Sequence, residues 1–227
     1  MLKQILYNGA AIVGISEIDD GNMRFFEGDE NKIISNQKRL GDVIGLAKNR
    51  IARVKTVYER RESFTEYQEI TDNNLAKYSI SNYEEQIPVS DGLVTKSTKI
   101  GLLLPLADCL GIIVLDVEHG LVGLLHSGRQ NVEQFGPKKF IEYLVENFES
   151  NPAHLQIYFS PHATKYQLFE FDNKYLPAVA KEQLIEAGVM LGNIIDPEIS
   201  TVDAENFPSH SNGDRKTRFA IAVKRIA

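Results

Sequence analysis

Short apolar runs in the middle of the chain set the fold class. They are almost wholly apolar and are separated by Gly, Asp and His, which is typical of strands with both faces buried. These predicted strands are residues 92–95, 100–106, 111–116 and 121–126. Less uniform patterns predict further strands at residues 5–15, 51–58, 155–159 and 219–225. The four central runs are therefore expected to form the middle of a sheet.

Apolar residues spaced three and four apart predict helices between these strands. The predicted helices are residues 29–46, 132–148 and 173–187. Ser35 or Asn36 is expected to cap the longer part of the first, and Gly188 to close the last. The polar segment 60–89 is expected to be a surface excursion with at most short elements. Alternating strands and helices predict an α/β protein, and the absence of repeats and linkers predicts a single domain over residues 1–227.

Composition narrows the partners and the kind of site. A net charge of -6 is unfavourable for binding a phosphate backbone, so no nucleic-acid partner is expected. No apolar run approaches the roughly 20 residues that span a bilayer, and no signal peptide is recognisable. We therefore expect no membrane partner and a cytoplasmic location. The lone cysteine, Cys109, excludes an internal disulfide and an all-cysteine metal site, but it allows a mixed one.

Two of the central strands end at side chains that can carry chemistry. Asp108 and Cys109 follow the run LLLPLA, and His126 ends the run LVGLLH. Gly128 precedes a predicted helix, where backbone N–H groups would face an anion, and Arg129 would add a fixed positive charge. A structural interpretation stays open beside this one, because lone cysteines and hydrogen-bonded histidines are common in protein cores.

Three segments carry a recognisable family pattern. They are VSDGLVT (89–95), LPLADCLGIIVLD (104–116) and GLVGLLHSGRQ (120–130), followed by the predicted helix. They resemble the YfiH-type family, also called the laccase-domain or multicopper polyphenol oxidoreductase family. Weaker matches, such as Asn36 and Arg218, extend the resemblance over nearly the whole chain. The resemblance implies a layered α/β/β/α sandwich like the catalytic domain of cytotoxic necrotizing factor toxins.

The same resemblance implies an enzyme that acts on purine nucleosides. The family activities are phosphorolysis of adenosine, inosine or methylthioadenosine and deamination of adenosine, so the implied partners are a purine nucleoside and phosphate. The family site holds a metal, taken as zinc rather than copper, on two His and one Cys. Cys109 and His126 match two of these ligands and are the predicted catalytic residues, whereas Tyr58 occupies the position of the missing His. A monomer or small homo-oligomer is expected.

The sequence departs from the family pattern around this site. No His precedes His119, Arg129 lies one place early, and Ser211 and Asn212 replace a pair of arginines near the C-terminus. His162 and His210 are alternatives for the third ligand, although a loop position without a ligand role is favoured for each. The predicted substrate-binding residues are Asn36, Asp108, Arg129 and His162.

Three functions stay open at this point. The first is an active purine-nucleoside enzyme with zinc on Cys109 and His126. The second is a metal-free hydrolase of amides or esters in which Cys109 is the nucleophile and His126 its base. The third is a family member that has lost catalysis and keeps a binding or scaffolding role, which the missing His and Arg residues favour. Copper-dependent phenol oxidation is least expected, because multicopper chemistry needs more histidine ligands than the five in this chain.

Overall fold

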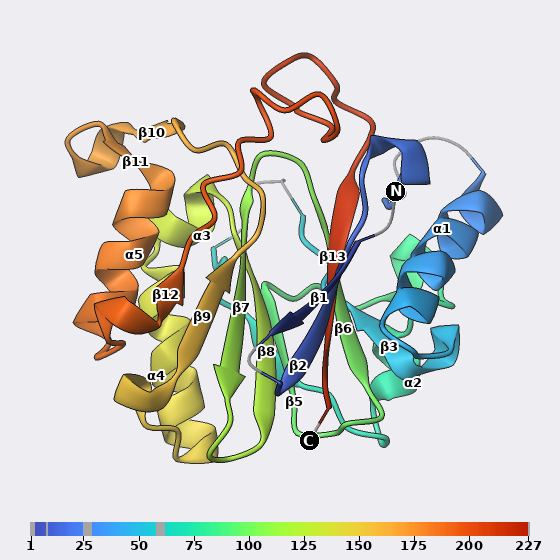
Figure 1. Ribbon diagram of the computed structural model, residues 1–227, viewed down its shortest axis with the longest axis horizontal. Coiled ribbons are helices and arrows are strands. Elements are labelled where there is room, and N and C mark those ends of the chain that lie inside the picture. Colours follow the sequence, from blue (N-terminus) through green and yellow to red (C-terminus); the bar gives the residue numbers. More distant parts are fainter. Residues whose placement is uncertain (1–2, 8, 25–28, 58–61, 227) are drawn as a thin grey trace.

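The computed structural model describes residues 3–7, 9–24, 29–57 and 62–226. Two sheets lie face to face between two groups of helices (Figure 1). The five-stranded sheet has the order β1 (Lys3–Tyr7), β2 (Ala11–Ile15), β13 (Phe219–Arg225), β6 (Gly101–Leu106) and β3 (Ile51–Arg53). The six-stranded sheet has the order β12 (Ile194–Ile195), β9 (Gln156–Phe159), β7 (Leu110–Asp116), β8 (Leu121–Ser127), β5 (Gly92–Thr95) and β4 (Tyr67–Glu69).

Alternating side chains of the central strands divide between two hydrophobic cores. In β7, Ile113 and Leu115 belong to the core between the sheets, whereas Ile112 and Val114 belong to the core under the helices. Helices α4 (Gly136–Phe148) and α5 (Leu176–Glu186) cover the outer face of the six-stranded sheet, and α1 (Glu30–Val43) covers the other sheet (Figure 1). The prediction of central strands buried on both faces, in an α/β/β/α arrangement, is confirmed.

Two predicted elements are each divided in two. The strand predicted at residues 5–15 is the antiparallel hairpin β1–β2, with Gly9 in a left-handed conformation at a φ of 69°. The helix predicted at residues 132–148 is two helices, α3 (Arg129–Glu133) and α4. Phe135 lies between them with a φ of 60°, which ends one helix and begins the next in a new direction. Apolar spacing alone does not reveal such a break.

The ends of other elements also differ from the prediction. Helix α1 begins after Asp29, whose carboxylate accepts the N–H of Asn31, so the prediction of Ser35 or Asn36 as the cap is wrong. Strand β3 has three residues, and Tyr58 lies outside the described residues. The expected excursion is confirmed over residues 62–89, where the elements are β4, α2 (Leu75–Tyr78) and a 3₁₀ turn.

A short hairpin of β10 (Gln167–Leu168) and β11 (Lys174–Tyr175) precedes α5 and is absent from the sequence prediction. Helix α5 therefore begins three residues later than predicted, at Leu176. No helix in the described ranges has both the length and the apolar character that crossing a membrane requires.

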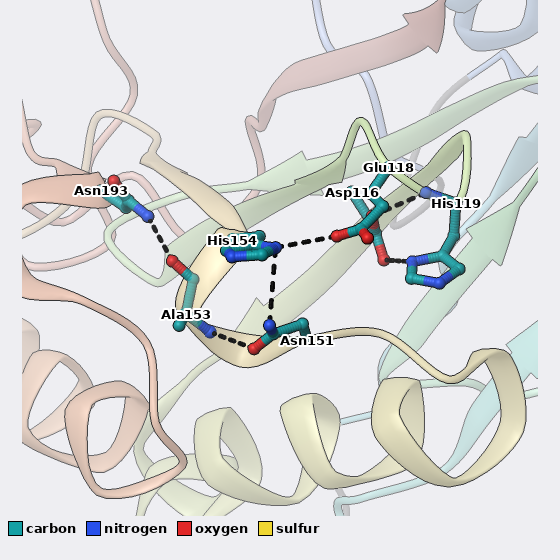
Figure 2. A network of polar contacts seen from close by, with 7 residues as sticks. All are labelled: Asp116, Glu118, His119, Asn151, Ala153, His154 and Asn193. Carbon is teal, nitrogen blue, oxygen red and sulfur yellow. Dashed lines mark hydrogen bonds and ion pairs between the residues drawn. The ribbon is translucent and has the colours of Figure 1, made fainter.

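A polar network closes the end of β7 that lies far from Cys109 (Figure 2). The Asp116 carboxylate accepts the backbone N–H of His119 at 2.9 Å and contacts Nδ1 of the same residue at 2.9 Å. Nearby, Nδ1 of His154 lies 2.8 Å from the Glu118 carboxylate. The first pair is mostly buried, with Asp116 only 2% exposed, whereas more than half of each side chain in the second pair is exposed. The network ties the β7–β8 turn to the 3₁₀ turn Pro152–His154.

Replacing Asp116 by asparagine is expected to lower the free energy of unfolding at pH 7 by about 1.5–3 kcal/mol, because a buried charge-assisted hydrogen bond is lost. Burial alone would raise the pKa of Asp116, but hydrogen bonds from Ser150 and His119 outweigh it and hold the pKa below its usual value. A lowered pKa in the folded state stabilises the fold above the unfolded pKa of about 3.9, and this stabilisation is lost as the pH falls through the folded pKa.

Urea denaturation at pH 7 and at pH 3 measures the effect. The difference between wild type and Asp116→Asn should shrink at the lower pH. Glu118→Gln is the matched control: its pair is exposed, so it should change stability by less than about 1 kcal/mol. Equal effects of the two substitutions would contradict the expectation.

Candidate active site

A cavity of about 680 Å³ lies where β7 begins and β8 ends. In Figure 1 this is the upper end of the sheets, where the chain before β13 crosses over. Four of the predicted site residues line the cavity: Asp108, Cys109, His126 and Arg129. His210, one alternative for a third ligand, lines it as well. The cavity therefore brings together the residues that follow the central apolar strands.

The register of β7 and β8 places Cys109 beside His126. The strands are antiparallel, with Gly111 opposite His126, so the residue just before β7 meets the residues just after β8. A methyl group on Gly128 would lie 3.2 Å from Sγ of Cys109 and 3.4 Å from Nε2 of His126. The thiol and the imidazole thus face the same small space, and glycine at position 128 keeps that space open.

The surroundings of Cys109 keep its thiol protonated. Burial raises the pKa of the Cys109 thiol to about 11, and the negative charge of Asp108 adds to the increase. The positive charges of Arg218 and Arg24 oppose this rise but do not cancel it. At neutral pH the group is therefore a neutral thiol rather than a thiolate.

Three arginines are among the residues that line the cavity: Arg129, Arg215 and Arg218. Arg218 is 4% exposed, and its Nη1 donates to the carbonyl of Thr217 at 2.7 Å. Arg129 is largely exposed and lies 4.0 Å from the Glu133 carboxylate. Because α3 is only five residues long, the arginine side chains rather than a helix terminus supply most of the positive charge here. The positive charge of these arginines is suited to binding an anion.

Other residues of the lining are apolar. Val57, Phe64, Ala163, Tyr166 and Leu176 present mainly apolar surface to the cavity. Tyr166 is 40% exposed and lies at the edge, whereas Phe64 is buried. A lining that combines apolar residues with arginines fits a ligand with a flat apolar part and a negatively charged part.

Several residues at the cavity have no signal in the sequence that assigns them a role. Arg215 lies in a polar stretch before β13 that gives no periodic signal, so its proximity to Cys109 follows only from the fold. Asp91 was quoted within a motif but given no role. It is fully buried, its carboxylate accepts the N–H of Glu66 at 2.8 Å, and its carbonyl accepts the N–H of His126 at 2.8 Å. Arg24 is not among the lining residues, but its positive charge acts to lower the pKa of the Cys109 thiol.

Two predicted substrate-binding residues are not among those that line the cavity. Asn36 is buried in α1, where its side chain donates to the Asn22 carbonyl at 2.8 Å and accepts from Arg39 at 2.9 Å. His162 is 1% exposed, and its Nδ1 lies 2.7 Å from the carbonyl of Ser160. Their roles in binding stay predictions.

Residues 12–181 match the family model described as multi-copper polyphenol oxidoreductase laccase. The chain belongs to this laccase family. The resemblance inferred from the central motifs is therefore confirmed. The YfiH protein of Bacillus licheniformis, solved by crystallography, is 18% identical, with a TM-score of 0.84 over 97% of this chain and 98% of that chain. This likeness shows the fold and confirms the expected architecture.

Curated relatives of this laccase-family chain include two bacterial purine nucleoside phosphorylases. The protein of Campylobacter jejuni is 29% identical over 59% of this chain and 66% of its own length. The protein of Corynebacterium glutamicum is 25% identical over 44% of this chain and 36% of its own length. The chain thus spans between about one third and two thirds of the length of the curated relatives it matches.

The family description implies a metal, so the donors in the cavity can be compared with a metal site. A thiol and an imidazole that face one space are suitable zinc or copper ligands. Catalytic zinc takes three protein ligands, however, and the described residues contain no group of three or more His, Cys, Asp or Glu side chains that could hold a metal ion. The described donors therefore do not complete the expected site, and zinc stays a prediction.

Proposed function

We propose that this chain cleaves purine nucleosides by phosphorolysis in the cavity shared by Cys109 and His126. One observation carries the proposal: the lining of a single cavity combines apolar residues, three arginines and the Cys109–His126 pair. The names of the curated relatives, purine nucleoside phosphorylases, support the same chemistry. The nucleoside and inorganic phosphate are the two substrates.

The arginines and the apolar lining residues are proposed to bind different substrates. Arginine side chains bind phosphate with charge-assisted hydrogen bonds, so Arg215 and Arg218 hold the phosphate. The apolar lining residues, among them Phe64 and Tyr166, pack against the purine. The residues that position both substrates bring a phosphate oxygen close to the sugar carbon that carries the base.

The reaction exchanges one bond for another. A C–O bond forms between phosphate and the sugar carbon, and the C–N bond to the base breaks, with no change of oxidation state and no water consumed. The departing base must take up a proton, and His126 and the protonated Cys109 thiol are the groups proposed to supply or relay it. Phosphate is the nucleophile, so no cysteine thiolate is needed.

The competing functions make different demands on the same residues. A metal-free hydrolase requires a Cys109 thiolate, which a thiol pKa of about 11 disfavours at neutral pH. A family member that has lost catalysis would bind a ligand in the cavity without converting it to product. Deamination of adenosine, and zinc on Cys109 and His126, are finer predictions that rest on the family resemblance.

The proposal is tested by incubating the protein with inosine, adenosine or methylthioadenosine, with and without phosphate. The expected products are the free base and the sugar 1-phosphate, formed only when phosphate is present. Ammonia release from adenosine would show deamination instead. Binding of nucleosides without any turnover would support the binding role and contradict the proposal.

Removing the buried arginine is expected to weaken the use of phosphate more than removing the exposed one. Arg218→Gln should raise the KM for phosphate about tenfold, because a desolvated charge-assisted contact is lost. Arg129→Gln should raise it less than about threefold, because solvent screens an exposed guanidinium. The phosphate KM of both variants is measured from initial rates at varied phosphate concentration and saturating nucleoside. Thermal unfolding checks that the variants are folded. A larger rise in the phosphate KM for Arg129→Gln than for Arg218→Gln would contradict the assignment of phosphate binding to Arg218.

A further inference from the structure

Asp108 uses both of its carboxylate oxygens within the protein. Oδ1 accepts the hydroxyl of Thr201 at 2.8 Å. Oδ2 accepts the backbone N–H and the hydroxyl of Ser211, both at 2.7 Å, and the hydroxyl of Ser209 at 3.2 Å. Oδ2 thus accepts three donors and has no acceptor position left for a substrate hydroxyl, and Oδ1 already accepts one donor. Thr201 and Ser209 are themselves buried, which strengthens their hydrogen bonds to a charged group.

The backbone of Asp108 joins further parts of the cavity. Its φ of 67° is left-handed, a conformation that aspartate tolerates better than most residues. Its carbonyl accepts the N–H of Ala163 at 2.8 Å. Asp108 therefore connects the turn that carries Cys109 to two other lining segments, one at Ala163 and one at Ser211.

The segment of residues 209–218, which we name the arginine loop, carries His210, Arg215 and Arg218 into the lining. His210 and Arg215 are exposed, so burial does not fix their positions. Hydrogen bonds fix the loop instead. Asp108 holds both neighbours of His210, and at the other end the N–H of Arg218 donates to the side chain of Asn22 at 3.0 Å.

We propose that Asp108 is a positioning residue that fixes the arginine loop over the cavity, rather than a residue that binds substrate. The inference rests on the proposed function only where phosphate use is concerned. Asp108 acts through Ser209 and Ser211, and thereby sets where His210 and Arg215 stand relative to Cys109. The sequence prediction of Asp108 as a substrate ligand is replaced by this role in the proposal.

Two substitutions separate the hydrogen bonds from the charge. Asp108→Gly removes the carboxylate while allowing the positive φ. Asp108→Asn also tolerates that φ, and its amide oxygen can still accept from Ser209 and Ser211 while its NH₂ group faces Thr201. If Asp108 is a positioning residue, Asp108→Asn should keep most of the loop order and phosphate binding that Asp108→Gly loses. A role that depends on negative charge at the substrate predicts that both variants fail equally.

Hydrogen exchange of the Ser211 amide reports on the loop without any substrate. Asp108→Gly should accelerate that exchange about tenfold, the equivalent of one hydrogen bond to a charged group, and Asp108→Asn should change it less than about threefold. The double variant Ser209→Ala/Ser211→Ala removes the hydroxyl donors without adding a glycine, and it should accelerate exchange in the same direction. Unchanged exchange in Asp108→Gly would overturn the proposal.

Kinetics supply the second readout. Asp108→Gly should raise the KM for phosphate about tenfold while the KM for the nucleoside and kcat change less than about threefold, and Asp108→Asn should restore the phosphate KM. A selective rise in nucleoside KM, or an asparagine variant as impaired as the glycine variant, would overturn the positioning role. If the wild type shows no phosphorolysis, the exchange experiment still decides whether Asp108 fixes the arginine loop, so the two proposals fail separately.

Discussion

Replacing His126 by alanine is expected to lower kcat/KM for phosphorolysis by about 10²–10⁴-fold, the usual contribution of a residue that transfers a proton in the transition state. His126 is 5% exposed, lies at the end of β8 and faces the same space as the Cys109 thiol. No other described imidazole has this position: His210 lines the cavity from an exposed loop, and His162 is not among the lining residues. Product formation from inosine and phosphate measures the effect.

His154→Ala is the matched control for this variant. His154 pairs with the exposed Glu118 (Figure 2), which follows the end of β7 that lies far from Cys109, so its removal should leave phosphorolysis unchanged within about twofold. Metal analysis of the same preparations tests the zinc prediction, since zinc held by His126 should be lost in His126→Ala and kept in His154→Ala. More than a third of the wild-type rate in His126→Ala would contradict a role in proton transfer.

The central strands were predictable because their residues obey one local rule. Runs such as LGIIVLD are apolar at nearly every position, and strands covered on both faces accommodate this pattern at such short lengths. The positions of Cys109 and His126 followed as well, since each lies where an apolar run ends. The family resemblance predicted that both residues belong to one site, and the β7–β8 register brings them to the same space.

The parts that could not be predicted depend on contacts between distant segments. Phe135 breaks the long helix through a backbone angle that apolar spacing does not encode. Arg215 lines the cavity although it is about a hundred residues from Asp108 in the chain, and Asp108 accepts hydrogen bonds from Ser211 near the start of the same loop. Motif position placed Asp108 at the site, but the hydrogen bonds that it makes to Ser211 could not be read from the sequence. Of the three lining arginines, Arg129 was predicted from its place after Gly128, whereas the position of Arg215 depends on tertiary structure.

Cys109 is expected to react with iodoacetamide about 100-fold more slowly at pH 8 than a free cysteine, because a thiol pKa of about 11 leaves very little thiolate. The sign follows from the environment: burial and Asp108 favour the neutral thiol, and the arginines oppose them only in part. The rate should continue to rise with pH until about pH 11. Mass spectrometry of the alkylated chain measures it, with EDTA present so that bound metal does not shield the sulfur, and Cys109→Ala is the control because the chain has no other cysteine.

The shape of this pH profile decides which atom attacks the substrate. A rate that rises beyond pH 9 leaves Cys109 as a proton carrier and leaves phosphate as the nucleophile, in agreement with phosphorolysis. A fast rate that levels off near pH 7 would show an activated thiolate beside His126 and would favour the metal-free hydrolase instead. Arg218→Gln sharpens the comparison, because loss of that positive charge should raise the pKa of Cys109 further and slow alkylation at every pH below it.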